Sequence, residues 1–352
     1  MTGSRAGVPR PWCILRAVDS LERVRRRLRG AAVDRPPNFD IYMQRAAHHV
    51  GQPLSLYYLD HRVLVEANLA VLEAFSLDIV QAISDPYREA YDLGLDVEWP
   101  EDALPLRREV LLKDPGDAAS LRLAKPEDGR RMTDRLEAVR LLRERVGDDV
   151  PVMGWVEGAF ALASVLRGDT NLLLDIHDRP EWLTELLDRL VEVGVAFARA
   201  QVAAGAHVVG LGDSMGSLVS PGQYRAFVLP YEQQVFAAVR EAGAIPRLHI
   251  CGDTRHIVAD MARSGAEIVD LDWRVDLGRA AEAFGPDGPA PCGNFDPVAV
   301  LLQGTPAEVE RAVHACAAAG GPRHFSAAGC EVPDRTPEAN LLAHARTLRQ
   351  LA

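Results

Sequence analysis

A histidine and a cysteine lie two positions apart in the stretch RLHICGDT, at residues 247–254. The apolar residues around them predict a β-strand, in which side chains two positions apart point to the same side. Histidine and cysteine are both zinc-binding residue types, so His249 and Cys251 form a candidate metal pair. The alternative interpretation is a core histidine beside a buried thiol.

A third possible ligand, Cys330, follows in the sequence AAGC, 79 residues after Cys251. Three ligands of the His/Cys/Cys type suit zinc and leave the fourth tetrahedral position for water or substrate, as in catalytic sites. A carboxylate such as Glu157 or Asp213 could fill that position instead. We therefore predict one zinc ion per chain, held by His249, Cys251 and Cys330.

The charge of this ligand set indicates its chemistry. Two thiolates cancel the charge of Zn²⁺, so a substrate thiol at the open position can lose its proton near neutral pH and remain a negative nucleophile. A site with three histidines would leave more positive charge on the metal and would better suit the acidification of water. The ligand types therefore favour alkyl transfer to sulfur.

Other polar residues also follow predicted strands, and from them we take Asp85, Glu157 and Asp213 as catalytic candidates and Asn294 as a cofactor-binding candidate. Asp272 and Asp213 are candidates to orient His249, although both could instead cap the helices that follow. In a closed parallel barrel such strand ends meet at one face, even when they are distant in sequence.

Strand-like segments alternate with helical patterns such as residues 180–205 and 221–243, which end in glycine. The eight segments cover residues 38–43, 78–84, 150–155, 207–213, 245–251, 267–272, 290–294 and 323–329. This alternation favours an α/β fold of the (β/α)8 TIM-barrel type over an open doubly wound sheet, whose GxGxxG loop is missing.

The whole chain, residues 1–352, is predicted to form a single barrel domain with residues 1–37 as an N-terminal helical extension. In the extension, RVRRRLRG is interpreted as the exposed face of an amphipathic helix, because Leu21, Val24 and Leu28 recur at helical spacing. Residues 114–132 are predicted to be a long loop before a helix at 136–147.

The composition fits a folded enzyme, with 48% hydrophobic and 25% charged residues. A net charge of -11 argues against a nucleic-acid partner. The longest apolar stretches are interrupted by Glu192, Arg199 and His207, so we expect no membrane insertion and a cytoplasmic location. Five cysteines fit reduced thiols better than disulfides. We expect a monomer or a homodimer.

Several motifs resemble those of the uroporphyrinogen decarboxylase superfamily, and within it the zinc-dependent corrinoid methyltransferases of the methylcobamide:coenzyme M type. These motifs are DRPP (34–37), SDP (84–86), EAYDLG (89–94), LHICGDT (248–254), GNFDPV (293–298), GTPAEV (304–309) and GCEVPDRTPEAN (329–340). The resemblance extends from about residue 18 to the end of the chain.

The resemblance implies a (β/α)8 barrel in which His249, Cys251 and Cys330 bind Zn²⁺. It further implies that a thiol accepts a methyl group from methylcobalamin or another corrinoid, usually carried on a small separate corrinoid protein. The predicted function is thus a zinc-dependent methyltransferase acting on a small thiol or a related methylated substrate.

Two alternatives remain open: a decarboxylase-like lyase and a non-catalytic barrel that binds a corrinoid or tetrapyrrole. Asp85, in SDP, corresponds to the essential aspartate of the decarboxylases. The arginine-rich segment that those enzymes use for porphyrinogen carboxylates reads MQRAAHH here and keeps only Arg45. The decarboxylase GHG turn is also replaced by Gly329-Cys330-Glu331. These departures disfavour porphyrinogen decarboxylation.

Overall fold

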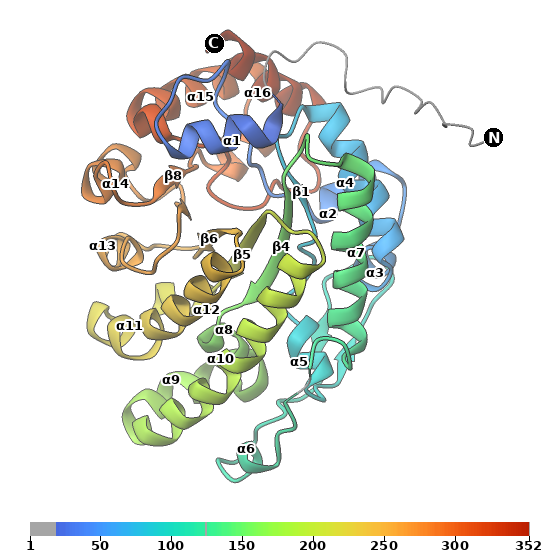
Figure 1. The fold of residues 1–352 in the computed structure, drawn as a ribbon, viewed down its shortest axis with the longest axis vertical. Helices are drawn as coiled ribbons and strands as arrows, with labels where there is room; N and C mark the ends of the chain where they lie inside the picture. The colour runs from blue at the N-terminus through green and yellow to red at the C-terminus, as the bar shows by residue number, and fades with distance from the viewer. Residues whose placement is uncertain (1–18, 124, 352) are drawn as a thin grey trace, which may run out of the picture.

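The barrel is built around a parallel sheet. The computed structural model describes residues 19–123 and 125–351, and Figure 1 shows helices surrounding the sheet. The sheet has the order β1-β4-β5-β6-β7-β8, and every neighbouring pair is parallel. Its strands are β1 (Val80–Gln81), β4 (Val152–Glu157), β5 (Val208–Gly212), β6 (Ile245–His249), β7 (Ile268–Asp270) and β8 (Ala290–Cys292).

Two further segments close this sheet into a barrel. Bridges join Cys292 to Phe325, and Ser326 to Asn38. The backbone N–H of Asp78, just before β1, donates to the carbonyl of Asn38 at 2.9 Å. The predicted segments 38–43 and 323–329 therefore complete the ring, and the eight predicted segments coincide with its eight members. The predicted (β/α)8 barrel is confirmed.

Helices and a small hairpin surround the ring. The α-helices are α1 (Ser20–Leu28), α2 (Gln44–His49), α3 (Leu54–Leu59), α4 (His61–Phe75), α5 (Arg88–Asp92), α6 (Asp117–Ser120), α7 (Arg130–Val146), α8 (Ala159–Arg167), α9 (Asp169–Asp178), α10 (Pro180–Ala203), α11 (Pro221–Phe227), α12 (Leu229–Glu241), α13 (Val258–Met261), α14 (Leu277–Phe284), α15 (Pro306–Gly320) and α16 (Glu338–Gln350). The remaining elements are the antiparallel strands β2 (Val97–Glu98) and β3 (Leu106–Arg107), the 3-10 turns η2 (Ser214–Leu218) and η4 (Gly321–Arg323), and the π-helical turn η3 (Pro297–Leu302). No helix of the described residues is both long enough and apolar enough to cross a membrane.

Alternation along the strands separates two apolar layers. Neighbouring strand residues fall into different buried clusters: Ile79, Val208 and Ile268 in the smaller one, Val80, Val209 and Val269 in the larger one. The smaller cluster draws residues from most members of the ring and fills the barrel interior, as in other barrels of this type. The larger cluster lies between the strands and the surrounding helices.

Two predicted helices differ from the structure. The pattern at 221–243 forms two helices, α11 and α12, because Pro230 lacks the N–H that an uninterrupted helix requires. The helix predicted at 136–147 is α7, which begins earlier, at Arg130. The carboxylate of Asp92 accepts the N–H groups of Arg131 and Met132 and stabilises this added turn.

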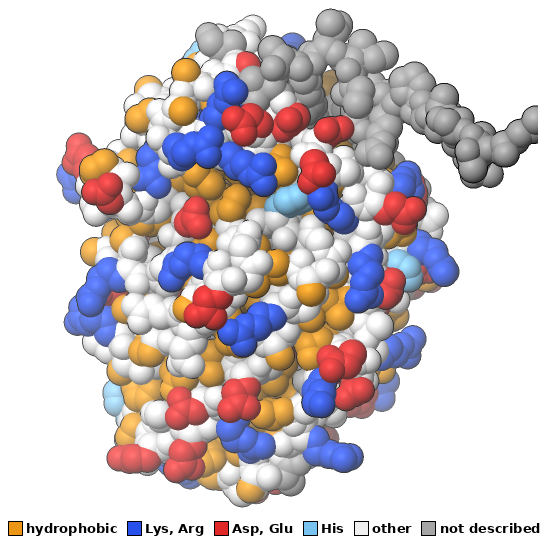
Figure 2. Space-filling model, in the orientation of Figure 1, with side chains coloured by type: hydrophobic (Ala, Val, Ile, Leu, Met, Phe, Trp, Pro, Cys, Tyr) orange, Lys and Arg blue, Asp and Glu red, His pale blue; other side chains and the backbone are white. Residues whose placement is uncertain are grey.

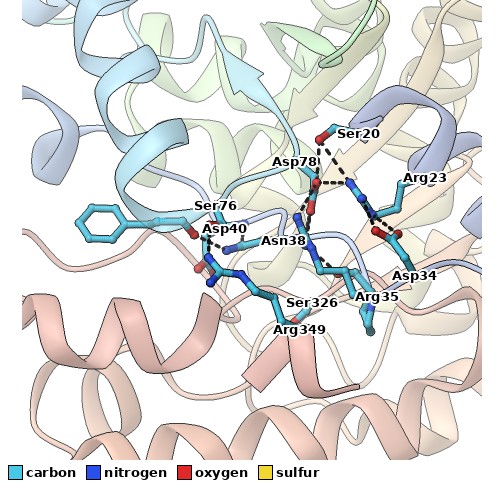
Figure 3. Close-up of polar contacts among 12 residues, drawn as sticks. Ser20, Arg23, Asp34, Arg35, Asn38, Asp40, Ser76, Asp78, Ser326 and Arg349 are labelled. Atoms are coloured by element: carbon cyan, nitrogen blue, oxygen red, sulfur yellow. Dashed lines mark hydrogen bonds and ion pairs between the residues drawn. The ribbon is translucent and has the colours of Figure 1, made fainter. Parts of the chain in front are cut away.

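The predicted N-terminal helix is present as α1, with Leu21 and Val24 buried. Asp78, at the start of the β1 segment, joins α1 to the barrel (Figure 3). Its carboxylate accepts from Ser20 and from Arg23 of α1, both at 2.8 Å, and from Arg35 at 2.6 Å. Residues 1–18 of the predicted extension, including Cys13, lie outside the described residues.

Figure 2 shows one face of the molecule, on which acidic and basic side chains are interspersed. This face therefore presents no broad surface of a single sign of charge. The cysteines of the described residues, at positions 251, 292, 316 and 330, are all free thiols, as predicted.

Candidate metal centre

Three predicted ligands meet at the carboxyl end of the barrel. His249 is the last residue of β6, Cys251 follows it, and Cys330 follows the closing segment 323–329. Their ligand atoms all lie within 4.8 Å of one another, with 4.0 Å between Cys330 Sγ and His249 Nε2. Ligand atoms bound to one zinc ion at about 2.0–2.3 Å lie roughly 3.5–3.8 Å apart, so this donor set fits zinc after small side-chain movements.

The ring of His249 is oriented by Asp270, which lies directly opposite it on β7. Nδ1 of His249 lies 2.9 Å from Asp270 Oδ2, so Nε2 faces the two cysteines. Asp270 is itself paired with Arg247 of β6 at 2.9 Å, in the barrel interior. A carboxylate behind a metal-binding imidazole fixes its tautomer and raises its basicity. Asp270 was not among the residues predicted to orient His249.

The thiols influence each other. Their hydrogen bond lowers the pKa of Cys251 and raises that of Cys330. Burial opposes a charge on His249, but Asp270 and Cys330 outweigh it and raise its pKa to about 10. The two thiols and the imidazole therefore interact electrostatically as one cluster, and metal binding would require the thiols to lose their protons.

The ligands line a cavity of about 230 Å³ at the barrel mouth. Asp85 and Glu157, two of the predicted catalytic residues, line it as well. Its apolar wall is formed by Ile41, Met43, Tyr58, Ile83, Leu104 and Trp155. The indole of Trp155 lies 5.9 Å from the His249 ring, between ring centres. The cavity thus joins the metal ligands to an apolar space of small-molecule size.

Glu157 and Asp85, two carboxyl groups of the cavity, each form an ion pair with an arginine. Glu157 is 2.6 Å from Arg88 and accepts from the indole N–H of Trp155 at 3.2 Å. Burial raises the pKa of Glu157 to about 7, although Arg88 opposes the shift. Burial also opposes ionisation of Asp85, but Arg131 and Arg88 outweigh it and lower its pKa. Of these two carboxyl groups, Glu157 is the one whose pKa lies near neutral pH.

Glu331 also lines the cavity, next to Cys330. Its carboxylate accepts the backbone N–H of Gln44 at 3.0 Å. Burial raises its pKa to about 7. In the sequence Glu331 stood out only as part of Gly329-Cys330-Glu331, which replaces the decarboxylase GHG turn, and it was assigned no role.

Asp213 and Asn294 do not line the cavity. Asp213 is fully buried, and its Oδ1 accepts the N–H of Ala161 in the first turn of α8 at 2.9 Å. Asn294 donates to the carbonyls of Asp272 at 3.0 Å and Val275 at 2.7 Å. Asp213 therefore binds the start of α8, and Asn294 binds the loop after β7. The catalytic and cofactor-binding roles assigned to these two residues stay predictions.

Asp272 does not contact the ring of His249 either. It accepts the N–H of Gly252 at 3.0 Å and that of Arg274 at 3.0 Å. It supports the loop that carries Cys251, whereas Asp270 supports the imidazole. Asp270 could have been identified from its position opposite His249 on the neighbouring strand. That position depends on the strand register, which the sequence alone does not specify.

Comparison with known proteins places these features in a family. The family model of uroporphyrinogen decarboxylase (URO-D) matches residues 19–351. A uroporphyrinogen decarboxylase from Streptomyces griseus is 34% identical over 265 residues, which cover 74% of this chain and 70% of the relative. A methylcobamide:CoM methyltransferase from Methanosarcina mazei is also 34% identical, over 208 residues that cover 58% of this chain and 60% of the relative.

A solved structure shares the fold over nearly its whole length. It is a methyltransferase from Methanosarcina mazei, with a TM-score of 0.86 and 24% identity, covering 95% of this chain and 98% of that one. A B12-independent methionine synthase from Shewanella is more distant, with a TM-score of 0.57 and 11% identity.

Proposed function

Because the chain belongs to the uroporphyrinogen decarboxylase family, whose members include decarboxylases and methyltransferases, we propose that it is a zinc-dependent methyltransferase acting between a corrinoid and a small thiol. The observation that carries the proposal is the cluster of His249, Cys251 and Cys330 beside a small apolar cavity. Zinc bound there would lower the pKa of an incoming thiol and leave its sulfur nucleophilic.

The residues of this chain have distinct tasks in such a reaction. Asp270 holds the imidazole of His249 with Nε2 directed at the ligand cluster. The apolar wall around Trp155 excludes water that would compete for the methyl group. Glu157 can take up the proton that the thiol releases, because its pKa is near neutral. A methyl transfer to a thiolate then needs no further base.

The cavity supports thiol methylation over porphyrinogen decarboxylation. Uroporphyrinogen is a macrocycle of four pyrroles that carry carboxylates, whereas the cavity is lined by three carboxyl groups and by Arg88, which is already paired with Glu157. Arg45, the arginine left from the decarboxylase pattern, does not line the cavity and pairs with Glu338 at 3.4 Å. The charged groups of the cavity therefore do not favour a substrate with many carboxylates.

The methyl donor is proposed to be a corrinoid, presented at the barrel mouth by a small separate corrinoid protein. The mouth is where the cavity opens and where the loops after the strands converge, as in other barrel enzymes. The relative from Methanosarcina mazei is named for transfer between a methylcobamide and CoM.

The proposal is tested by mixing zinc-loaded protein with free methylcobalamin and a panel of small thiols. Loss of the methyl–cobalt absorbance, together with appearance of the methyl thioether, is the expected result. A protein that contains zinc but turns over no thiol contradicts the proposal.

Decarboxylation is the second candidate, because several curated relatives are named uroporphyrinogen decarboxylase. Incubation with uroporphyrinogen and chromatography of the porphyrins decide it, and we expect no product.

The third candidate, a barrel that binds without catalysis, would hold zinc with a fourth protein ligand. In that case addition of thiol would not change the metal's ligands in X-ray absorption spectra.

A further inference from the structure

The cavity beside the candidate metal centre contains more acidic than basic side chains. Among the described residues that line it, Asp85, Glu157 and Glu331 carry carboxyl groups, and Arg88 is the one lysine or arginine. Asp85 and Glu157 are paired with arginines, so Glu331 is the lining carboxyl group whose charge lacks an arginine partner. This feature bears on the charge of the thiol that the proposed function requires.

Arg88 is not available to bind an anion. Its side chain is 1% exposed, and its guanidinium donates to Glu157 at 2.6 Å and to the backbone carbonyl of Asp85. Its Nε lies 3.7 Å from the carboxylate of Glu89, a buried residue behind the cavity. Binding a substrate anion would require Arg88 to break these contacts and leave a buried carboxylate unpaired, which is costly.

The other arginines near the cavity are also committed. Arg131 does not line it, and its guanidinium contacts Asp85 and the carbonyl of Tyr58 and lies over the ring of Trp99. Arg45 pairs with Glu338 at 3.4 Å outside the lining. Arg131 is thus committed to Asp85 and Arg45 to Glu338, so neither guanidinium is free to pair with an acidic group of a substrate.

Glu331 differs from the other two carboxyl groups. Asp85 and Glu157 each contact an arginine, whereas the Glu331 carboxylate accepts the backbone N–H of Gln44. Among the described residues, no lysine or arginine lies within ion-pair distance of Glu331. Its side chain lines the same cavity as the three candidate ligands, so a substrate thiol bound to the metal would share this cavity with Glu331.

We propose that the thiol acceptor is a small alkyl thiol that is uncharged or carries an amino group, and that Glu331 is the specificity-determining residue that disfavours acidic thiols. This inference rests on the proposed function, because it concerns the thiol at the same site. A carboxylate or sulfonate on the substrate would face Glu331 without a compensating cation. An ammonium or hydroxyl group could donate a hydrogen bond to it.

The test compares thiols of similar size that differ in charge. They are 2-mercaptoethanol, 2-aminoethanethiol, 3-mercaptopropionate and 2-mercaptoethanesulfonate. Each is titrated by calorimetry into the full-length zinc-loaded protein at one pH and ionic strength. We expect the two acidic thiols to bind at least about tenfold more weakly than 2-mercaptoethanol, because like charges placed together in a binding site are strongly disfavoured.

The Glu331→Gln variant separates the charge of this residue from the shape of the cavity. We expect it to bind the acidic thiols several-fold more tightly and 2-aminoethanethiol more weakly, with little change for 2-mercaptoethanol. Glu338→Gln is the matched control, because it removes the same charge from a side chain that is 60% exposed and outside the cavity. Melting temperatures and zinc content of both variants are measured as well, to check that each retains the fold and the metal.

The outcomes distinguish this inference from the function on which it rests. Equal affinity of the wild-type protein for neutral and acidic thiols overturns the inference and leaves thiol methylation standing. A charge preference that survives in Glu331→Gln removes the role of this residue. Failure of every thiol to bind or to accept a methyl group contradicts the proposed function itself.

Discussion

One segment of the barrel begins and ends with an aspartate, and the two ends differ in what surrounds them. Asp78, just before β1, is fully buried and bound by Ser20, Arg23, Arg35 and the N–H of Asn38. Asp85, at the other end, is also held by arginine but borders the cavity with the candidate ligands. Both aspartates thus pair with arginine. The pairs of Asp78 attach α1 to the barrel, whereas the pair of Asp85 lies at the candidate substrate site.

This difference shows that residue type alone does not identify a functional carboxylate. A second example is the buried chain of Ser326, His344 and Asp40, linked by hydrogen bonds of 2.8 and 2.9 Å. It has the residue types of a nucleophilic triad, but all three side chains are buried and none lines the cavity. Position at the carboxyl end of the barrel and access to a cavity are the features that distinguish the candidate site.

The largest expected effect is a loss of bound zinc when a candidate ligand cysteine, rather than a core cysteine, is replaced. We expect Cys330→Ala to reduce zinc to well below one ion per chain, because only two protein ligands remain. Cys316→Ala is the matched control, since Cys316 is buried in the helical layer, and it should retain zinc. Elemental analysis of protein purified without chelator measures both. Full zinc in Cys330→Ala would show that the ligand assignment is wrong.

The next effect concerns stability at the opposite end of the barrel. We expect Asp78→Ala to lower the free energy of unfolding by about 3–5 kcal/mol, because it leaves the buried Arg23 and Arg35 without this partner. Urea unfolding measures the change. Asp96→Ala, at an exposed aspartate, should stay within about 0.5 kcal/mol of wild type. A loss below about 1 kcal/mol in Asp78→Ala would contradict a structural role for this cluster.

A smaller effect is expected at the residue that orients the metal ligand. Asp270→Asn should weaken zinc binding by about 10–100-fold, because the partner of His249 Nδ1 loses its charge. Competition with a chromophoric chelator measures the affinity. Asp253→Asn, two residues after Cys251 and paired with Arg255, is expected to leave it unchanged. Equal affinities in the two variants would exclude an orienting role for Asp270.

The smallest effect depends on pH and lies at the rim. His48 of α2 bridges Asp334 at 2.6 Å and Asp102 at 2.7 Å. Burial opposes its charge, but both aspartates outweigh it, so its pKa is raised above 6.5. The bridge therefore stabilises the fold fully below the unfolded pKa, and this contribution is lost as pH rises through the folded pKa.

His48→Gln should accordingly cost less than about 1 kcal/mol at acidic pH and nothing above the folded pKa, since the pair is partly exposed. The measurement is the difference in free energy of unfolding between wild type and variant across that pH range. A difference that does not change with pH would show that the contribution of His48 is not ionic.

Local patterns in the sequence were sufficient for much of the fold. The eight strand segments follow from short apolar runs bounded by turns, and His249 with Cys251 follows from the two-residue period of a strand. Grouping them with Cys330 required only the rule that strand ends meet at one face of a barrel. These predictions depend on period and chain order, which a single sequence contains.

The features that were missed depend on contacts between distant segments. The pairing of His249 with Asp270 follows from the register of β6 and β7. The early start of α7 follows from Asp92, which lies in a different helix and binds its first turn. Local sequence does not distinguish Arg88 or Arg131 from other arginines, and only the fold brings them to Glu157 and Asp85.

The closing bridges of the barrel have a consequence for synthesis on the ribosome. Asn38 pairs with Ser326, so one of the first described segments must wait for one of the last before the ring can close. Pairings so distant in sequence form late, because the intervening chain must be ordered first. Cys330 lies just beyond this joint, and a nascent chain that has not reached it holds only His249 and Cys251 of the candidate ligands. If the proposed zinc site is correct, zinc uptake would therefore report that the closing segment and Cys330 have joined the ring.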